Sequence, residues 1–329
     1  MAIPENFANR EIETISRLYR NSEARLMRVI QSATATDFQR GRSWILLKQI
    51  QTILTELEAG HQRWAEQNVI QWYRRGMAET AKTHRQPLPA FTQIHRQAVE
   101  ALVQRMVATS AERVQSVAVG VSSAFIGAQQ RVVQEQALAA QIAEGVIEGL
   151  GPEELSKRIV QTLQDGAVRR LGTYVDPVLK QQLQQTAEGK LIHILCKDGK
   201  TRAYNLKDYG RMVGITESRF AASEGVMKTT LEYGEDLVQW SVHTGACAIC
   251  LPLQGKVFSI TGQNKDFPIL TDDSRCPAHP KCRHCLAPVV ESFLRDRGQY
   301  DALRQFSNAP EARVNDFAAF RERIHARAA

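Results

Sequence analysis

The chain has 329 residues, of which 43% are hydrophobic and 23% charged, and its net charge is +7 with a pI near 9.2. No apolar run approaches the ~20 residues that a membrane-spanning helix needs, and the first residues lack the basic and apolar regions of a secretory signal. These features predict a soluble globular protein, folded in a cytoplasm that keeps thiols reduced. The positive charge would suit a nucleic-acid or acidic partner, but no long basic run concentrates it.

Residues 6–189 are predicted to be almost wholly helical, because apolar side chains recur there at helical spacing. Two stripes carry this pattern: Ile12, Ile15, Tyr19, Leu26, Val29 and Ile30, then Leu46, Leu47, Ile50, Ile53, Leu54 and Leu57, extended by Trp64 and Trp72. Pro87 and Pro89 forbid a continuous helix, and further helices are expected at 91–148 and from Pro152 onward. Helices of ~40 residues would reach about 60 Å, a length typical of antiparallel hairpins or of helices that lie against a partner.

A small α+β module is predicted at 190–290, where short β-prone runs replace the helical stripes. The run 191–196 is expected to form a first strand, and 201–205 returns as the second. Between them, Asp198-Gly199 is a strong signal for a two-residue hairpin turn. A β-hairpin is therefore expected to open the module.

A helix and another strand are predicted after this hairpin. Asn205 is placed to cap a helix at 206–233, with Asp208 in its first turn. Gly234 is expected to end that helix. The alternation of apolar and polar residues at 236–243 then predicts a strand.

These elements make the predicted fold class α+β, in three segments. An extended helical docking region with hairpin-like long helices is expected at 1–189. The module at 190–290 carries a cluster of cysteines and histidines at its end. A short helical C-terminal tail is expected at 291–329, with a break at 308–310. The apolar stripes are expected to serve helix packing rather than a cofactor site.

The cysteines are concentrated near the end of the module, since five of the six lie within 247–285. In a reducing compartment such clustering favours metal over disulfides. Structural zinc takes four tetrahedral Cys or His ligands, often supplied as two closely spaced pairs. Cys247 and Cys250 form one C-x-x-C pair, which a tight turn would place on one ion.

The second pair of ligands has two alternatives. His279 with Cys282 gives H-x-x-C, and Cys282 with Cys285 gives C-x-x-C; the spacing alone allows both. Cys276 and His284 are spare candidates. We predict a structural zinc ion here. The alternatives are reduced, buried cysteines that act as small apolar side chains, or a disulfide within the cluster.

Catalysis has little support in the sequence. A catalytic zinc site needs a general base nearby, as in H-E-x-x-H or H-x-E, and neither pattern is present. A nuclease of the His-Asn-His type would need a His doublet, whereas His193 and His243 stand alone. Glu217, Arg219 and Glu224 lie on one predicted helix, but a solvated face with ion pairs explains them better. Nucleic-acid binding through the metal loops lacks an adjoining basic recognition helix.

An ordered set of residues in the module resembles a known family. The residues are Asp198, Gly199, Tyr204, Thr216, Glu217, Asp236, Leu237, Val238, Ser241 and His243, then C-x-x-C at 247–250, Q-G-K-V-F at 254–258 and H-P-K-C-R-H at 279–284. They resemble the phage minor capsid protein 2 family, relatives of the phage Mu F-type head morphogenesis proteins. The resemblance covers 199–290 and favours Cys247, Cys250, His279 and Cys282 as ligands. Cys276 and Cys285 are not part of the family string.

This resemblance implies a minor, non-enzymatic structural protein of a tailed-phage head. Such a protein would be made in the host cytoplasm and sit in few copies in the virion, near the portal vertex. Its partners would be the portal protein or the major capsid protein, with non-specific contact to packaged DNA and no membrane, and it would aid head assembly or genome packaging.

The competing interpretation is a genome-associated effector or enzyme carried in the virion, of a nuclease or ADP-ribosyltransferase-like kind. The resemblance allows it, because Mu F-type modules can be joined to toxin or transferase domains. The 39 residues after Val290 are too few for an added catalytic domain, so we favour the structural role.

Overall fold

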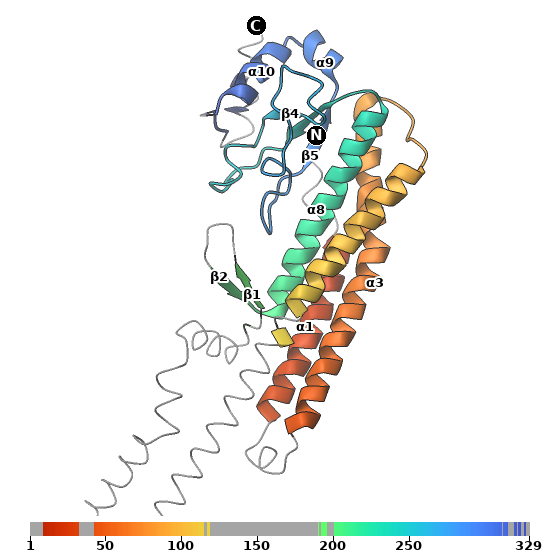
Figure 1. The fold of residues 1–329 in the computed structure, drawn as a ribbon. Helices are drawn as coiled ribbons and strands as arrows, with labels where there is room; N and C mark the ends of the chain where they lie inside the picture. Colours follow the sequence, from red (N-terminus) through yellow and green to blue (C-terminus); the bar gives the residue numbers. More distant parts are fainter. Residues whose placement is uncertain are drawn as a thin grey trace, which may run out of the picture. The chain divides into compact units, whose positions relative to one another are not determined.

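The computed structural model describes residues 9–32, 43–114, 117–118, 190, 192–195, 201–310, 312–314, 319–320, 322–323 and 326. The predicted helix from Pro152, the far end of the predicted helix at 91–148 and the turn at Asp198-Gly199 lie outside these residues. In chain order the elements are α1 (Asn9–Ser32), α3 (Ser43–His84), β1 (Ile192–Leu195), β2 (Thr201–Tyr204), α8 (Leu206–Glu232), β3 (Leu237–Trp240), β4 (Val257–Ser259), β5 (Leu286–Val289), α9 (Glu291–Asp296) and α10 (Tyr300–Asn308), and Figure 1 labels all of them except β3. A further helix covers 93–114. Long helices followed by a small sheet confirm the predicted α+β class.

The chain forms two compact units that are interleaved along the sequence. Unit 1 comprises Met1–Leu18, Ala59–Thr109 and Gly210–Ala329, and unit 2 comprises Tyr19–Glu58 and Ser110–Tyr209. Helices α1, α3 and α8 each contribute residues to both units. The three-segment division expected from the sequence stays a prediction. Among the described residues, no helix combines the length and the apolar character that crossing a membrane requires.

The apolar stripes of the first two long helices are largely buried where the structure describes their side chains, which supports the predicted helix packing. Ile15 of α1 and both Leu57 and Trp72 of α3 are almost completely inaccessible to solvent. α3 ends at His84, and the next helix covers 93–114. The break predicted from the two prolines is therefore confirmed. With 42 residues, α3 also has the expected length of about 60 Å.

Two glycines let α3 (orange in Figure 1) and α8 (green) pack backbone against backbone in unit 1. A Cβ atom added to Gly76 of α3 would lie 2.1 Å from the carbonyl oxygen of Ala222. One added to Gly225 of α8 would lie 2.1 Å from the carbonyl oxygen of Tyr73. A side chain at either position would overlap the facing backbone, so this crossing requires glycine on both helices.

A chain of hydrogen bonds joins three helices of unit 1. The His95 ring, from helix 93–114, is fully buried. Its Nδ1 lies 2.9 Å from the hydroxyl oxygen of Tyr73 on α3, and its Nε2 lies 3.0 Å from the carboxylate of Glu232 on α8. Because a carboxylate only accepts hydrogen bonds, Nε2 carries a proton, and in the neutral ring the Tyr73 hydroxyl donates to Nδ1. Both ring nitrogens are thereby satisfied.

Replacing Tyr73 with phenylalanine is expected to destabilise unit 1, because it leaves the buried Nδ1 of His95 without a donor. An unsatisfied buried group of this kind costs about 1–3 kcal/mol, which urea unfolding would measure. Tyr233→Phe is the matched control, since the Tyr233 hydroxyl donates to the carbonyl of Pro87 at an exposed position. Equal losses in the two variants would contradict a special role for the buried ring.

A three-stranded antiparallel sheet in the order β4-β3-β5 lies in the C-terminal part of unit 1. Successive residues of β3 face opposite sides of it. Leu237 belongs to an apolar cluster that includes Phe306 of α10. Val238 and Trp240 belong to a second cluster, which includes Met227 of α8. The sheet therefore lies between α10 on one face and α8 on the other, and β3 confirms part of the strand predicted at 236–243.

Two short helices follow the sheet, where the sequence predicts a single helix up to residue 308. Gly298, with φ of 60°, separates α9 from α10, because this left-handed conformation ends a helix. The break predicted at 308–310 is confirmed, since α10 ends at Asn308. At that end, the buried ammonium of Lys256 donates to the carbonyl of Ala309 at 2.7 Å, a favourable place for a cation.

The carboxylate of Asp236 organises the chain that follows β4. It accepts hydrogen bonds from the Ser259 hydroxyl, from the backbone and hydroxyl of Thr261, each at 2.8 Å, and from the backbone N–H of Asn264 at 3.1 Å. Partial burial alone would raise the pKa of Asp236, but these donors outweigh burial and hold the pKa below its ordinary value.

The Asp236 carboxylate is expected to make the fold acid-sensitive. Because its pKa is lower in the folded than in the unfolded chain, its contribution is present above the ordinary pKa of 3.8 and is lost as the pH falls through the folded value. Asp236→Asn should lose about 1–2 kcal/mol at pH 7 and flatten the pH dependence below about pH 4. Denaturation at pH 7 and pH 3 measures both effects. Asp272→Asn, whose side chain is 99% exposed, should change neither.

Unit 2 contains two features predicted from the sequence. β1 and β2 pair antiparallel, with Ile192 opposite Tyr204, which confirms the two predicted strands and their pairing. Asn205 caps α8, because its Oδ1 accepts a hydrogen bond from the backbone N–H of Asp208 at 2.8 Å. The capping bond of Asn205 therefore confirms where this helix is predicted to start.

Candidate metal centre

The C-x-x-C pair lies on a tight turn of unit 1 that exposes one thiol and buries the other. The backbone N–H groups of Cys250 and Leu251 donate to the carbonyl of Cys247 at 3.0 and 2.9 Å. Cys247 is exposed, whereas Cys250 is buried. Partial burial would raise the pKa of Cys247, but the backbone N–H groups of Cys250 and Ile249 lower it below its ordinary value. The turn therefore favours a thiolate at the exposed position.

The H-x-x-C pair lies on a loop that is anchored to α8. The backbone N–H of Lys281 donates to the hydroxyl of Thr216 at 3.1 Å. The carbonyl of Arg283 accepts a hydrogen bond from the guanidinium of Arg219. Lys281 itself has φ of 61°, a conformation uncommon for residues other than glycine. These bonds fix the loop close to the C-x-x-C turn.

The two pairs meet in space. The Nε2 atom of His279 lies 3.2 Å from the Sγ atom of Cys247 and 3.1 Å from that of Cys250. The Sγ atoms of Cys250 and Cys282 lie 3.6 Å apart. Donors of one zinc tetrahedron lie about 3.4–3.8 Å apart, because Zn–S bonds are about 2.3 Å and Zn–N bonds about 2.1 Å long. The spacing of these atoms is thus close to that of a zinc site.

The surroundings of His279 favour a cation at its Nε2. Its Nδ1 lies 2.8 Å from the carbonyl oxygen of Pro280, which only accepts hydrogen bonds, so Nδ1 carries a proton. The hydrogen bond with Cys282 raises the pKa of His279 to about 9. Hydrogen bonds from Cys250 and Cys276 in turn lower the pKa of Cys282. A site that holds a proton between imidazole and thiolate also suits a metal ion.

Two donor groups overlap in this cluster. One comprises Cys247, Cys250 and His279, and the other comprises Cys250, Cys282 and His284; within each group all the ligand atoms lie within 4.8 Å of one another. Either group could hold a metal ion. The structure thus brings together the four residues favoured as ligands by the family resemblance. It also adds His284, which the sequence offers only as a spare candidate.

The remaining cysteines of the cluster lie outside both donor groups. Cys285, the alternative ligand allowed by spacing, is buried and packs against Ala222. Cys276 is also buried, and this burial raises the pKa of its thiol, as suits a donor to the sulfur of Cys282. The five described cysteines form no disulfide. The choice of His279 over Cys285 as the fourth ligand stays a prediction.

The charged residues considered as an alternative site on α8 have structural partners. Glu217 pairs with Arg105 and Glu224 with Arg275, while Arg219 donates to the carbonyl of Arg283 in the loop of the H-x-x-C pair. Burial raises the pKa of Glu217. The ion pairs expected on this helix are therefore present, but they are partly buried rather than fully solvated.

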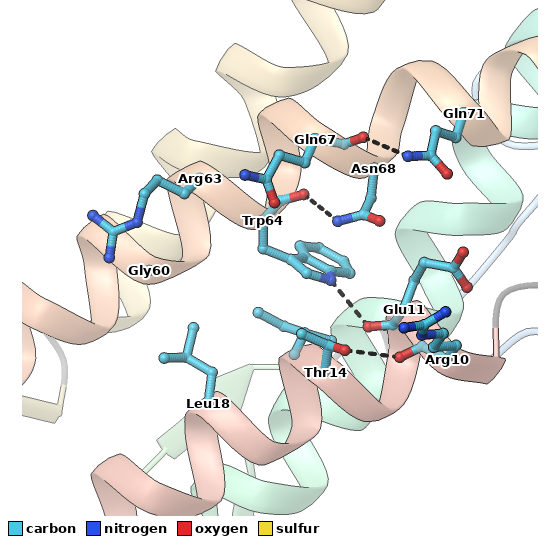
Figure 2. A pocket seen from close by; sticks show the side chains of 11 residues that line it. Arg10, Glu11, Thr14, Leu18, Gly60, Arg63, Trp64, Gln67, Asn68 and Gln71 are labelled. Carbon is cyan, nitrogen blue, oxygen red and sulfur yellow. Dashed lines mark hydrogen bonds between the residues drawn. The ribbon is translucent and has the colours of Figure 1, made fainter.

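A groove between α1 and α3 is a second candidate site in unit 1. It encloses about 530 Å³ and is lined by Arg10, Glu11, Thr14, Ile15, Leu18, Gly60, Arg63, Trp64, Gln67, Asn68 and Gln71. Figure 2 shows polar side chains bonded to helix backbone: Trp64 Nε1 donates to the carbonyl of Glu11 at 3.0 Å, and Asn68 to that of Trp64 at 2.7 Å. The single carboxylate, on Glu11, pairs with Arg75. No thiol or imidazole lines the groove, so it offers no acid-base pair.

Of the two histidines considered for a nuclease, His243 has partners within unit 1. His243 Nε2 lies 3.0 Å from the hydroxyl of Ser241, and the His243 ring meets the ring of His284 edge-on at 4.8 Å. His193 belongs to β1, in unit 2. His243 belongs to neither of the metal-capable groups found among the described residues.

Fold and site together define a class of protein: an α+β chain with long helices and a Cys/His group that could hold a metal ion. The model of a family described as phage minor capsid protein 2 matches residues 155–328. Because this match covers more than half of the 329 residues, the chain belongs to the phage minor capsid protein 2 family. No curated protein and no solved structure matches it.

Membership of this family confirms the resemblance seen in 199–290. It gives the chain a structural role in a phage particle and implies interaction with other virion components. It also points to a structural rather than an enzymatic role. Three residues of the family string have structural tasks here. Gln254 accepts hydrogen bonds beside the Cys/His cluster, Lys256 donates to the carbonyl at the end of α10, and the carbonyl of Arg283 ties the loop of the H-x-x-C pair to α8.

Proposed function

We propose that the chain is a minor, non-catalytic structural protein of a tailed-phage head, docked on the portal protein or the major capsid protein near the portal vertex. In this position it aids head assembly or genome packaging, in few copies per virion. The family match over 155–328 is the observation that carries the proposal. The net charge of +7 is compatible with non-specific contact to packaged DNA.

We further propose that unit 1 carries one structural zinc ion, held by Cys247, Cys250, His279 and Cys282. Thiolate and imidazole are the ligands that structural zinc takes, and the distances between these donors support it. Cys250 and Cys282 belong to the apolar cluster of Trp240 and α8. The ion would therefore join the exposed turn and the loop to the sheet, and it would supply rigidity rather than a reaction.

Docking is assigned to the helical region. Leu88, in the segment between α3 and helix 93–114, is 57% exposed, and Ile94, in the first turn of that helix, is 58% exposed. The part of unit 1 near the metal group offers a comparable pair, Ile249 and Ile269, at 50% and 52%. The members of the two pairs are exposed to similar extents, so the two pairs can be compared directly.

Co-purification with the portal protein tests the assignment. The double variant Leu88→Asp, Ile94→Asp should lose association, because a charge at a buried interface is costly. The double variant Ile249→Asp, Ile269→Asp should retain it. Both pairs are exposed in the free protein, so neither double variant should lower the unfolding temperature by much. If the Ile249 and Ile269 variant loses association and the Leu88 and Ile94 variant retains it, the docking surface is instead in the part of unit 1 near the metal group.

The proposal as a whole fails if the protein is missing from purified virions and proheads. It also fails if the purified chain, given nucleic acid or a nicotinamide cofactor, shows turnover that is lost in Glu217→Ala. Elemental analysis of the purified protein addresses the metal separately. One zinc ion per chain, absent in Cys247→Ser, is the expected result.

A further inference from the structure

His284 is the histidine of the cluster that lies deepest in the fold. It is only 3% exposed, whereas Cys247 is exposed and His279 is partly exposed. Its Nδ1 lies 3.6 Å from the Sγ atom of Cys282. His284 forms the second donor group together with Cys250 and Cys282, and all three of these residues are buried. The cluster therefore has an outer and an inner side that share Cys250.

The orientation of the His284 ring is set by Gln254. The backbone N–H of His243 donates to Gln254 Oε1 at 3.1 Å, which identifies that atom as the amide oxygen. His284 Nε2 lies 3.0 Å from the same oxygen. An amide oxygen only accepts, so Nε2 carries a proton and, in the neutral ring, the lone pair is on Nδ1. That lone pair faces Cys282.

The Gln254 amide is a costly group at this place. Its side chain is fully buried, and its Nε2 has no hydrogen-bond partner among the described residues. An unsatisfied buried donor lowers stability. Any favourable role of the Gln254 side chain must therefore come from the hydrogen bonds that its amide oxygen accepts. Histidine ligands of metals characteristically donate their second N–H to such an oxygen, which fixes the tautomer. In the same way, Nδ1 of His279 donates its N–H to the carbonyl oxygen of Pro280.

We propose that His284 is a fifth protein donor of this centre, and that Gln254 positions it. The inference rests on the proposed metal. A metal ion bound by Cys250 and Cys282 can then complete its coordination with Cys247 and His279 on the outer side, or with His284 on the inner side. The exposed outer donors are suited to capture an ion from solvent. The buried inner donor is suited to retain it, because the release of the ion would require His284 to detach as well.

Release of bound Zn²⁺ or Co²⁺ to a chelator tests this role. His284→Gln keeps a polar side chain but removes the imidazole, and it should speed release roughly 10- to 100-fold and shift the visible absorption of the cobalt form. His243→Gln is the matched control, since His243 adjoins His284 but lies outside both donor groups, and it should leave release and spectrum unchanged. Gln254→Leu should speed release roughly 10-fold, with His284 still present.

Nitrogen NMR of the unmodified protein gives a second reading that does not depend on how His284→Gln folds. Zinc should move the Nδ1 resonance of His284 and leave that of His243 in place. An unmoved His284 resonance, or release from His284→Gln at the wild-type rate, would overturn the proposal while leaving the outer zinc site intact. Absence of metal from the wild-type protein would overturn both.

Discussion

Gly76→Ala is expected to destabilise the protein by about 3 kcal/mol or more, although alanine is the better helix former by about 1 kcal/mol. The added methyl group would lie 2.1 Å from the carbonyl oxygen of Ala222, so α3 and α8 would have to separate. Their separation would also lengthen the hydrogen bonds through His95. Urea and thermal unfolding measure the loss, and Gly225→Ala should behave similarly from the other helix.

Gly60→Ala provides the matched control in the same helix. A Cβ atom there would lie 2.9 Å from the ends of the Leu18 side chain, which can rotate away. The helix preference of alanine should therefore dominate, and the variant should be neutral or more stable by up to about 1 kcal/mol. Equal destabilisation by Gly60→Ala and Gly76→Ala would mean that the backbone contact at the crossing does not matter.

Removal of the metal is expected to have the second large effect. A structural zinc ion contributes its binding free energy to folding, so a chelator should lower the unfolding free energy by at least about 3 kcal/mol. Cys250→Ser should do the same without chelator and should abolish any further response to it. Cys250 is the residue to change because it belongs to both donor groups.

Cys285→Ser is the control for Cys250→Ser, because it distinguishes the loss of a metal ligand from the loss of packing by a buried cysteine. Cys285 is as buried as Cys250, so the variant should lose some packing, about 1 kcal/mol. It should nevertheless keep one zinc ion per chain. If Cys285→Ser instead loses the ion while His279→Ala retains it, the second pair of ligands is Cys282 with Cys285, the alternative that spacing allows.

Local signals predicted the helices well. Asn205 and Gly234 mark the two ends of α8 because capping and left-handed backbone are properties of single residues, and the structure shows the capping bond and φ of 75° at Gly234. The two prolines at 87 and 89 work in the same way. Each of these signals acts over a few residues, so sequence alone suffices.

The small sheet is harder to foresee, because its edges depend on distant partners. β4 has only three residues and β5 contains Pro288, so β4 is too short and β5 too interrupted to give a clear strand signal. Both form because β3 lies between them and α8 and α10 cover the faces. The break at Gly298 was likewise not predicted, since a single glycine inside a helical pattern is ambiguous.

Some of the candidate metal ligands can likewise be predicted from the sequence, and others cannot. Spacing indicates Cys247, Cys250 and Cys282, because a C-x-x-C turn is a local feature. Spacing cannot choose between His279 and Cys285, which differ in the direction of their side chains. The inner donor His284 depends on Gln254, thirty residues away in the chain, and only its neighbourhood in space distinguishes it from His243.

The interleaving of the two units has a consequence for the order of events during synthesis. Unit 1 needs residues up to 109 and again from 210 onward, so roughly one hundred residues are synthesised between its second segment and the part of α8 that belongs to it. At about 5–20 residues per second, the earlier helices of unit 1 wait at least about 5–20 s for α8. A chaperone or an assembly partner that is present during this interval should raise the yield of folded protein more than one that is added afterwards.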